Sequence, residues 1–348
     1  HGMVAADHEY ASQAGALMLA KGGDAVDAVV AATLMLGVVS PFASGIGGGG
    51  FAIVRRKGGE HYALDFREVA PMKASRDMYL DTQGNPIPDG SRRGAKAAGV
   101  PGELAGLAEL HRRHGKLPWK TVVQPALEAA RNGFPCGSFL HKKIARFRTE
   151  IAQRPRLSAM FLNSVGQAIP AGIIVKRPRL AITLDAVAKM GAQAFYEGRI
   201  AAAIADAMAR DGGLITKQDL AEYRWKERRA LRTQIMDTTL ISMPPPSSGG
   251  AVLAQVLQTL DPSILKREGH NSSAYIHRIV EALKHGFADR ANVMGDPDYT
   301  PVPVKRMLGE EQRKKIQAAF NAHKTLKNSL YGGRYAAPKD GGTSHLSV

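Results

Sequence analysis

Cysteine is almost absent from this chain, since Cys136 is the only one among 348 residues. A single cysteine cannot form a disulfide within the chain, and it excludes zinc sites built from several thiolates. Long apolar runs are also missing. The longest largely apolar stretch, residues 28–39, is too short to span a bilayer and predicts a buried helix instead. We therefore expect no disulfide scaffold and no membrane segment in this stretch of sequence.

Acidic side chains are the minority, with 31 aspartates and glutamates against 47 lysines and arginines and a formal net charge of +16. A surplus of this size can indicate an anionic partner. The basic residues are scattered, however, and are not interleaved with the aromatic side chains that stack on nucleic-acid bases. The charge therefore favours a solvated basic face, or a face that meets an acidic partner subunit, over nucleic-acid binding.

Two common enzyme motifs are missing, the phosphate-binding GxxxxGK[ST] loop and the HExxH zinc pair. Residues 45–50, GIGGGG, do match the letters of the dinucleotide fingerprint GxGxxG. That fingerprint needs a strand before it and a helix after it. Here the pattern predicts a helix before and a strand after, so we interpret residues 45–50 as a turn where the backbone passes close to another segment.

The remaining pattern predicts a mixed protein in which helices outnumber strands. Residues 8–21 have helical apolar spacing and stop at Gly22-Gly23, and Asp24 is placed to cap a second, nearly all-apolar helix to about Val38. After the glycine run, residues 51–54 and 61–66 predict a β-hairpin. Further helices are expected at 119–132, 183–190, 199–210, 217–223 and 272–291, and a strand at 239–243. The fold class that follows is α+β.

The C-terminal end carries a possible nucleophile, because Thr343 directly follows Gly341-Gly342. Composition alone favours a glycine turn that leads into a strand. A chemical interpretation is also open, since two permissive glycines can hold a strained peptide bond in reach of a hydroxyl group.

A series of short motifs runs along the whole chain in a fixed order. The first are residues 2–5 (GMVA), 21–28 (KGGDAVDA), 44–51 (SGIGGGGF) and 64–71 (LDFREVAP). The later ones are residues 100–102 (VPG), 115–119 (GKLPW), 212–216 (GGLIT), 243–250 (MPPPSSGG), 295–298 (GDPD) and 343–348 (TSHLSV). In this order they resemble the motifs of γ-glutamyltranspeptidases. The chain departs from the family pattern in the unusually basic stretch 224–240, and in Asp24, where the family more often has asparagine.

The resemblance implies a four-layer αββα sandwich of the N-terminal nucleophile hydrolase type. That fold would be completed by a small subunit that is not in this chain. Residues 1–342 would be the large subunit of a single αββα domain, and residues 343–348 the start of the small subunit. The two subunits would form a heterodimer cut from one precursor.

The same resemblance implies a γ-glutamyltransferase and glutathione hydrolase. Thr343 would cut the chain after Gly342 and then, as the new N-terminal residue, attack the γ-amide of glutathione or a similar donor. The γ-glutamyl-Thr ester would be passed to an amine, a peptide or water. Arg67 would bind the substrate α-carboxylate, with Glu68 and His345 as possible supporting residues. No metal or organic cofactor is implied.

Three alternatives stay open at this point. A related acylase that acts on β-lactam side chains would share the fold and the processing, and a binding protein of the same fold would lack activity. A basic nucleic-acid-binding protein is the third. A periplasmic or secreted location is expected from the resemblance, and the sequence itself does not determine it.

Overall fold

The computed structural model describes residues 2–332 and 344–348, so the predicted nucleophile Thr343 lies outside the described residues. The chain divides into two compact units, each of which is considered by itself. Unit 1 comprises His1–Gly50, Phe66–Trp225 and Gly341–Val348, and unit 2 comprises Phe51–Asp65 and Lys226–Asp340.

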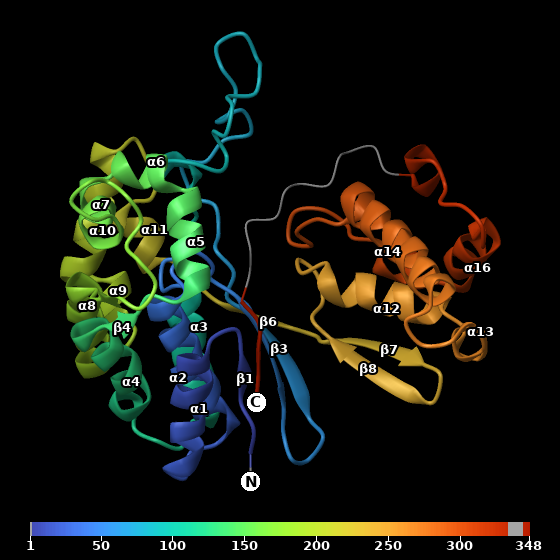
Figure 1. Cartoon of the computed structure of the whole chain (residues 1–348), viewed down its shortest axis with the longest axis horizontal. Helices are drawn as coiled ribbons and strands as arrows, with labels where there is room; N and C mark the ends of the chain where they lie inside the picture. The colour runs from blue at the N-terminus through green and yellow to red at the C-terminus, as the bar shows by residue number, and fades with distance from the viewer. Residues whose placement is uncertain (1, 333–343) are drawn as a thin grey trace. The chain divides into compact units, whose positions relative to one another are not determined.

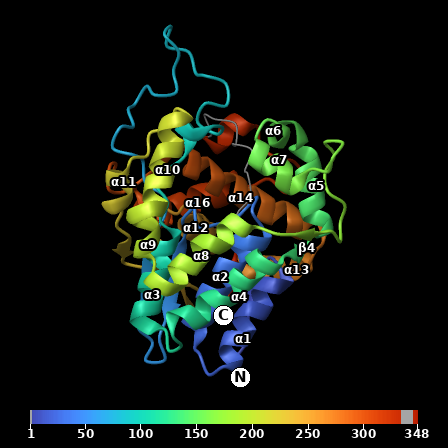
Figure 2. The same cartoon turned by 90° about the vertical axis from the view of Figure 1, so that its left-hand side faces the viewer.

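Unit 1 is mostly helical, as Figures 1 and 2 show. The expected helices at 119–132 and 199–210 are present as α4 and α10. Its helices are α1 (Glu9–Ala20), α2 (Ala25–Val39), α3 (Glu103–His114), α4 (Trp119–Asn132), α5 (Ser138–Arg146), α6 (Arg148–Ala152), α7 (Pro155–Phe161), α8 (Pro178–Met190), α9 (Gln193–Tyr196), α10 (Gly198–Arg210), α11 (Lys217–Ala221) and the short 3-10 turn η1 (Ala95–Ala97).

Helix α2 is the centre of unit 1, because it is buried on nearly all sides and contacts α1, α3 and α4. Its start is fixed by a reciprocal cap in which the Asp24 carboxylate accepts the N–H groups of Val26 and Asp27, while Asp27 accepts the N–H of Asp24. Asp27 is fully buried and also accepts the N–H groups of Lys116 and Leu117. One carboxylate thereby joins the start of α2 to the turn before α4.

Short strands complete unit 1. The β1 strand (Ala5–Ala6) pairs antiparallel with β9 (Leu346–Ser347), so segments from the two ends of the chain lie side by side (Figure 1). The β4 strand (Phe134–Pro135) pairs with β5 (Ile174–Val175). Because β9 also contacts α2, the residues that follow Thr343 pack on the surface of unit 1.

Unit 2 combines small antiparallel sheets with a helical layer. The predicted hairpin is confirmed as β2 (Phe51–Arg55) and β3 (His61–Asp65), and β6 (Lys226–Arg228) adds a third strand beside β3. A second hairpin is formed by β7 (Leu231–Ile235) and β8 (Thr238–Ser242). The helices are α12 (Gly249–Thr259), α13 (Pro262–Glu268), α14 (Ser273–Val293), α15 (Val304–Met307), α16 (Glu310–Ala319) and the 3-10 turn η2 (Asn328–Tyr331).

The basic stretch 224–240, which departs from the family pattern, forms strands, and two of its cations form ion pairs. Arg228 is mostly buried and forms ion pairs with Asp65 and Asp298, and Lys226 also pairs with Asp298. Hydrogen bonds from Arg228 and Lys226 hold the pKa of Asp298 well below its usual range. These cations therefore stabilise unit 2 and do not form a basic surface available to an external anion.

The differences from the sequence-based expectations have local causes. Helix α8 begins at Pro178, earlier than the expected Thr183, because proline is compatible with the first turn of a helix. Helix α12 was not expected because it begins with Gly249-Gly250. Gly250 is required there, since a methyl group at that position would lie 2.3 Å from the carbonyl oxygen of Met243. No helix in the described part of the chain is long and apolar enough to cross a membrane.

Candidate functional site

The glycine turn, residues 45–50, packs directly against the main chain that carries Arg67. Gly50 and Phe66 exchange two main-chain hydrogen bonds that continue the hairpin register. A methyl group at Gly49 would lie 2.4 Å from the carbonyl oxygen of Phe66 and 2.8 Å from the amide nitrogen of Glu68. Only glycine fits at this position, which confirms the interpretation of this run as a place of close backbone approach.

A third segment, at the start of α3, is hydrogen-bonded to the glycine turn and to the Arg67 segment. The Gly48 carbonyl accepts the N–H groups of Gly102 and Glu103 at 2.8 and 3.0 Å. Beyond Arg67, Val69 and Val100 exchange two further hydrogen bonds. The glycine turn, the Arg67 segment and the start of α3 are therefore linked through their backbones, and we call this arrangement the Arg67 clamp (residues 45–50, 66–69 and 99–103).

Arg67 projects from this clamp with an exposed side chain, while its carbonyl accepts a hydrogen bond of 3.0 Å from the Tyr223 hydroxyl. The neighbouring Glu68 side chain is half-buried and packs over Gly48 and Gly99. An exposed guanidinium on a fixed backbone can bind a carboxylate in a two-pronged geometry.

Glu103 is a buried acid inside the clamp that the sequence analysis missed. Its side chain is 5% exposed, and its Oε1 has no hydrogen-bond partner among the described atoms. Burial, followed by the nearby charge of Glu68, raises the pKa of Glu103 to about 8. The N-terminus of α3 favours the ionised form of Glu103, but burial favours the neutral form more strongly. At neutral pH, Glu103 is mostly a neutral acid beneath the Arg67 segment.

The residues after Thr343 are also held in unit 1. The His345 N–H donates to the Asp7 carboxylate at 3.0 Å, and the His345 side chain is exposed. Ser344 lines a cavity of about 390 Å³ together with Phe42, Phe139 and Lys143. The structure thus fixes the backbone directly downstream of Thr343, and it describes Arg67, Glu68 and His345 in the same unit.

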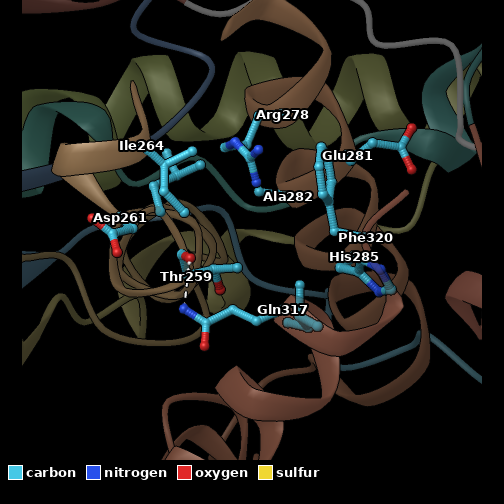
Figure 3. A pocket seen from close by; sticks show the side chains of 11 residues that line it. Thr259, Asp261, Ile264, Arg278, Glu281, Ala282, His285, Gln317 and Phe320 are labelled. Atoms are coloured by element: carbon cyan, nitrogen blue, oxygen red, sulfur yellow. Dashed lines mark hydrogen bonds between the residues drawn. The ribbon is translucent and has the colours of Figure 1, made fainter. Parts of the chain in front are cut away.

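A second cavity, of about 280 Å³, lies in unit 2 between α12, α13, α14 and α16 (Figure 3). Its Arg278 stacks on Phe320 and pairs with Glu268. Its Glu281 is buried, yet hydrogen bonds from Lys284, Tyr331 and Thr325 outweigh burial and lower its pKa to about 2. None of the predicted site residues that the structure describes lines this cavity. Arg278 and Glu281 are both bonded to other side chains of the protein, so we assign this cavity a structural role.

Among the described residues, no three histidine, cysteine, aspartate or glutamate side chains are grouped so that they could hold a metal ion. Arg67 and its clamp lie in the described part of the chain, and the role predicted for Thr343 stays a prediction. The sequence predicted roles for Arg67 and Glu68, but gave none to Glu103 in the clamp or to Tyr223, which contacts it. The only sequence signal for Glu103 was its place directly after residues 100–102, VPG.

The solved structures that this fold resembles are α+β N-terminal nucleophile hydrolases. The γ-glutamyltranspeptidase of Helicobacter pylori superimposes with a TM-score of 0.89 at 36% identity, over 94% of each chain. The predicted fold class is confirmed by this similarity.

The sequence matches the Gamma-glutamyltranspeptidase family over residues 11–348, and the chain belongs to that family. It is 40% identical to "Glutathione hydrolase 2" of Arabidopsis thaliana, over 100% of this chain and 59% of the relative. It is also 37% identical to "Acylase ACY 1 proenzyme" of Pseudomonas sp. (strain V22), over 100% of this chain and 62% of the relative. The chain thus spans about 60% of the length of these curated relatives.

The close approach at Gly49 generates a paired prediction with Gly47, where an added methyl group would meet nothing within 4 Å. We expect Gly49→Ala to lower the free energy of unfolding by about 2–4 kcal/mol, because the main chain of residues 66–68 must move. Gly47→Ala should stay within about 0.5 kcal/mol of the parent. Urea unfolding of both variants measures the difference, and equal effects would refute the clamp as a tightly packed contact.

Glu103 generates a prediction about pH. The pKa of a glutamate is 4.5 in the unfolded chain and about 8 at Glu103 in the folded protein. Between these values the unfolded state releases a proton that the folded state keeps. Stability must therefore fall as pH rises, by up to about 1.4 kcal/mol per pH unit from this group. Below pH 4.5 both states are protonated and the effect disappears.

The variant Glu103→Gln carries no titrating group at this position and should lack that slope. Its stability relative to the parent should therefore increase as the pH is raised from 5 to 8, as measured by urea unfolding at several pH values. A constant difference between the two proteins across this range would show that Glu103 is not a neutral acid in the folded state.

Proposed function

We propose that this chain is the large-subunit part of a γ-glutamyltransferase and glutathione hydrolase. The observation that carries the proposal is the Arg67 clamp in a member of this family: an exposed guanidinium on a backbone fixed by glycine contacts and hydrogen bonds. This is the group needed to bind the α-carboxylate that distinguishes a γ-glutamyl donor from a simple amide. Family membership and the similarity to a glutathione hydrolase support the same conclusion.

In the proposed activation, the Thr343 hydroxyl attacks the carbonyl carbon of Gly342. The peptide C–N bond breaks as the acyl group moves to oxygen, and water then hydrolyses the ester. The products are a carboxylate at Gly342 and a free α-amino group at Thr343. That amine has an ordinary pKa near neutrality, so it can act as a general base for its own hydroxyl. Residues 1–342 would then be the large subunit, and Thr343 would begin the small subunit.

In the proposed catalytic cycle, the Thr343 hydroxyl gives its proton to the α-amino group and attacks the γ-amide carbonyl. The proton passes to the departing amine as the C–N bond breaks, which leaves a γ-glutamyl ester on Thr343. An amine, a peptide or water then attacks this ester and regenerates the hydroxyl. The small subunit, glutathione-like donors and these acceptors are the partners in the proposal. A periplasmic or secreted location belongs to the same proposal.

An acylase activity on β-lactam side chains is the second candidate, because an acylase proenzyme is 37% identical over the whole chain. The Arg67 clamp favours the γ-glutamyl substrate, which presents an α-carboxylate near the scissile amide. Comparing hydrolysis of a γ-glutamyl anilide with that of an acyl β-lactam separates the two candidates. Faster turnover of the β-lactam would replace the proposed substrate.

Self-cleavage is the first expected outcome. The full-length protein should yield a fragment whose N-terminal residue is Thr343, and Thr343→Ala should block both cleavage and turnover because alanine has no nucleophile. Intact mass spectrometry and N-terminal sequencing give the answer. A parent protein that remains one polypeptide under native conditions, while it turns over a γ-glutamyl anilide, would refute the processing step.

The Arg67 prediction concerns the substrate. Arg67→Ala should reduce kcat/KM for a γ-glutamyl anilide by roughly 30- to several-thousand-fold, equivalent to about 2–5 kcal/mol, if the ion pair is desolvated in the complex. Arg67→Lys keeps the charge without the planar fork and should recover part of that loss. Self-cleavage should persist in both variants, because the cleaved peptide bond does not need a bound α-carboxylate. Unchanged kcat/KM in Arg67→Ala would remove Arg67 from the binding site.

A further inference from the structure

Tyr223 contacts the main chain of the residue proposed to bind substrate, although 156 positions separate them in the sequence. Its hydroxyl donates to the Arg67 carbonyl oxygen at 3.0 Å, and its side chain is 6% exposed. A buried hydrogen bond to the carbonyl restricts rotation of the peptide that follows Arg67. A fixed backbone under a long and exposed side chain contributes to the preorganisation of Arg67.

The Tyr223 ring packs against a second tyrosine, which is itself hydrogen-bonded to α3. It stacks on Tyr196, with ring centroids 5.8 Å apart and planes at 14°. The Tyr196 hydroxyl accepts the N–H of Ala105 in the first turn of α3 at 3.1 Å. A methyl group at Gly102 would lie 2.1 Å from the Tyr223 hydroxyl, so the hydroxyl reaches Arg67 only because residue 102 is glycine.

The segment that carries Tyr223 is also tied to the Arg67 segment at a second point. Asp219, on α11, accepts the N–H of Met72 at 2.7 Å. The same carboxylate closes the cap at Thr216, whose hydroxyl and N–H both donate to it. Helix α11 is thereby docked on the stretch that follows Arg67, and Tyr223 lies directly after it.

We propose that Tyr223 is a positioning residue for donor binding, which sets the direction of the Arg67 side chain through the Arg67 main chain without touching the substrate. This inference rests on the proposed function. A hydroxyl that only stabilised the fold would affect all substrates equally. A hydroxyl that positions Arg67 selectively affects donors that carry an α-carboxylate.

The test is Tyr223→Phe in the full-length, processed protein, which removes the hydroxyl and keeps the ring that stacks on Tyr196. The two probes are a γ-glutamyl anilide and the 4-aminobutanoyl anilide, which has the same amide and amino group without the α-carboxylate. We expect KM for the γ-glutamyl anilide to rise roughly 3- to 10-fold, with kcat changed by less than about twofold. The kcat/KM for the 4-aminobutanoyl anilide should stay at the parent value.

The matched control is Tyr79→Phe, because Tyr79 also donates a hydroxyl hydrogen bond to a main-chain carbonyl of unit 1, that of Lys96 at 3.3 Å. It should leave the preference between the two anilides unchanged. In an Arg67→Ala background, Tyr223→Phe should cause no further loss in kcat/KM, since the two residues act through one guanidinium.

The outcomes separate this inference from the proposed function. If Arg67→Ala removes the preference for the α-carboxylate and Tyr223→Phe behaves like Tyr79→Phe, the positioning role is wrong and the proposed function stands. If Arg67→Ala leaves that preference intact, the proposed role of Arg67 fails and the role of Tyr223 fails with it. A KM increase of equal size for both anilides in Tyr223→Phe would also overturn the inference.

Discussion

The contact of Gly49 with the main chain at Phe66 and Glu68 is the constraint on which the proposed site depends. It brings the turn after α2 against the segment after β3, and the neighbouring Gly48 carbonyl then accepts two N–H groups from the start of α3. Three separate segments thus meet through main-chain contacts and hydrogen bonds. Such contacts between backbones have little freedom to adjust, so the residue they present, Arg67, is held on a stiff support.

Local sequence patterns predicted the elements that depend on local physics. The cap at Asp24, the all-apolar helix after it and the hairpin on either side of residues 58–59 were predicted and are present. The helix before the glycine run and the strand after it were also predicted and are present. Arg67 and Glu68 were predicted as site residues through the resemblance of residues 64–71 to a family motif, and their roles stay predictions.

The remaining parts of the site depend on contacts that no local pattern encodes. Tyr223 reaches Arg67 from beyond α11, and the burial of Glu103 follows from how α3 meets the glycine turn. From sequence, Glu103 is an ordinary acidic residue in the first turn of a helix, where it would be expected in solvent. The ion pairs of Arg228 with Asp65 and Asp298 could not be predicted from the sequence for the same reason, since the two acids come from other strands and loops.

The pairing of β1 with β9 has a consequence for the order of events in maturation. A single polypeptide brings these strands together at the modest entropic cost of closing one large loop, whereas two separate chains would lose translational freedom to form the same ladder. If the chain is cut after it has folded, its two parts are already associated. Two parts made as separate chains would first have to meet by diffusion. Residues 346–347, which would follow the new amino terminus closely in the sequence, would already be paired with β1 when the cut is made.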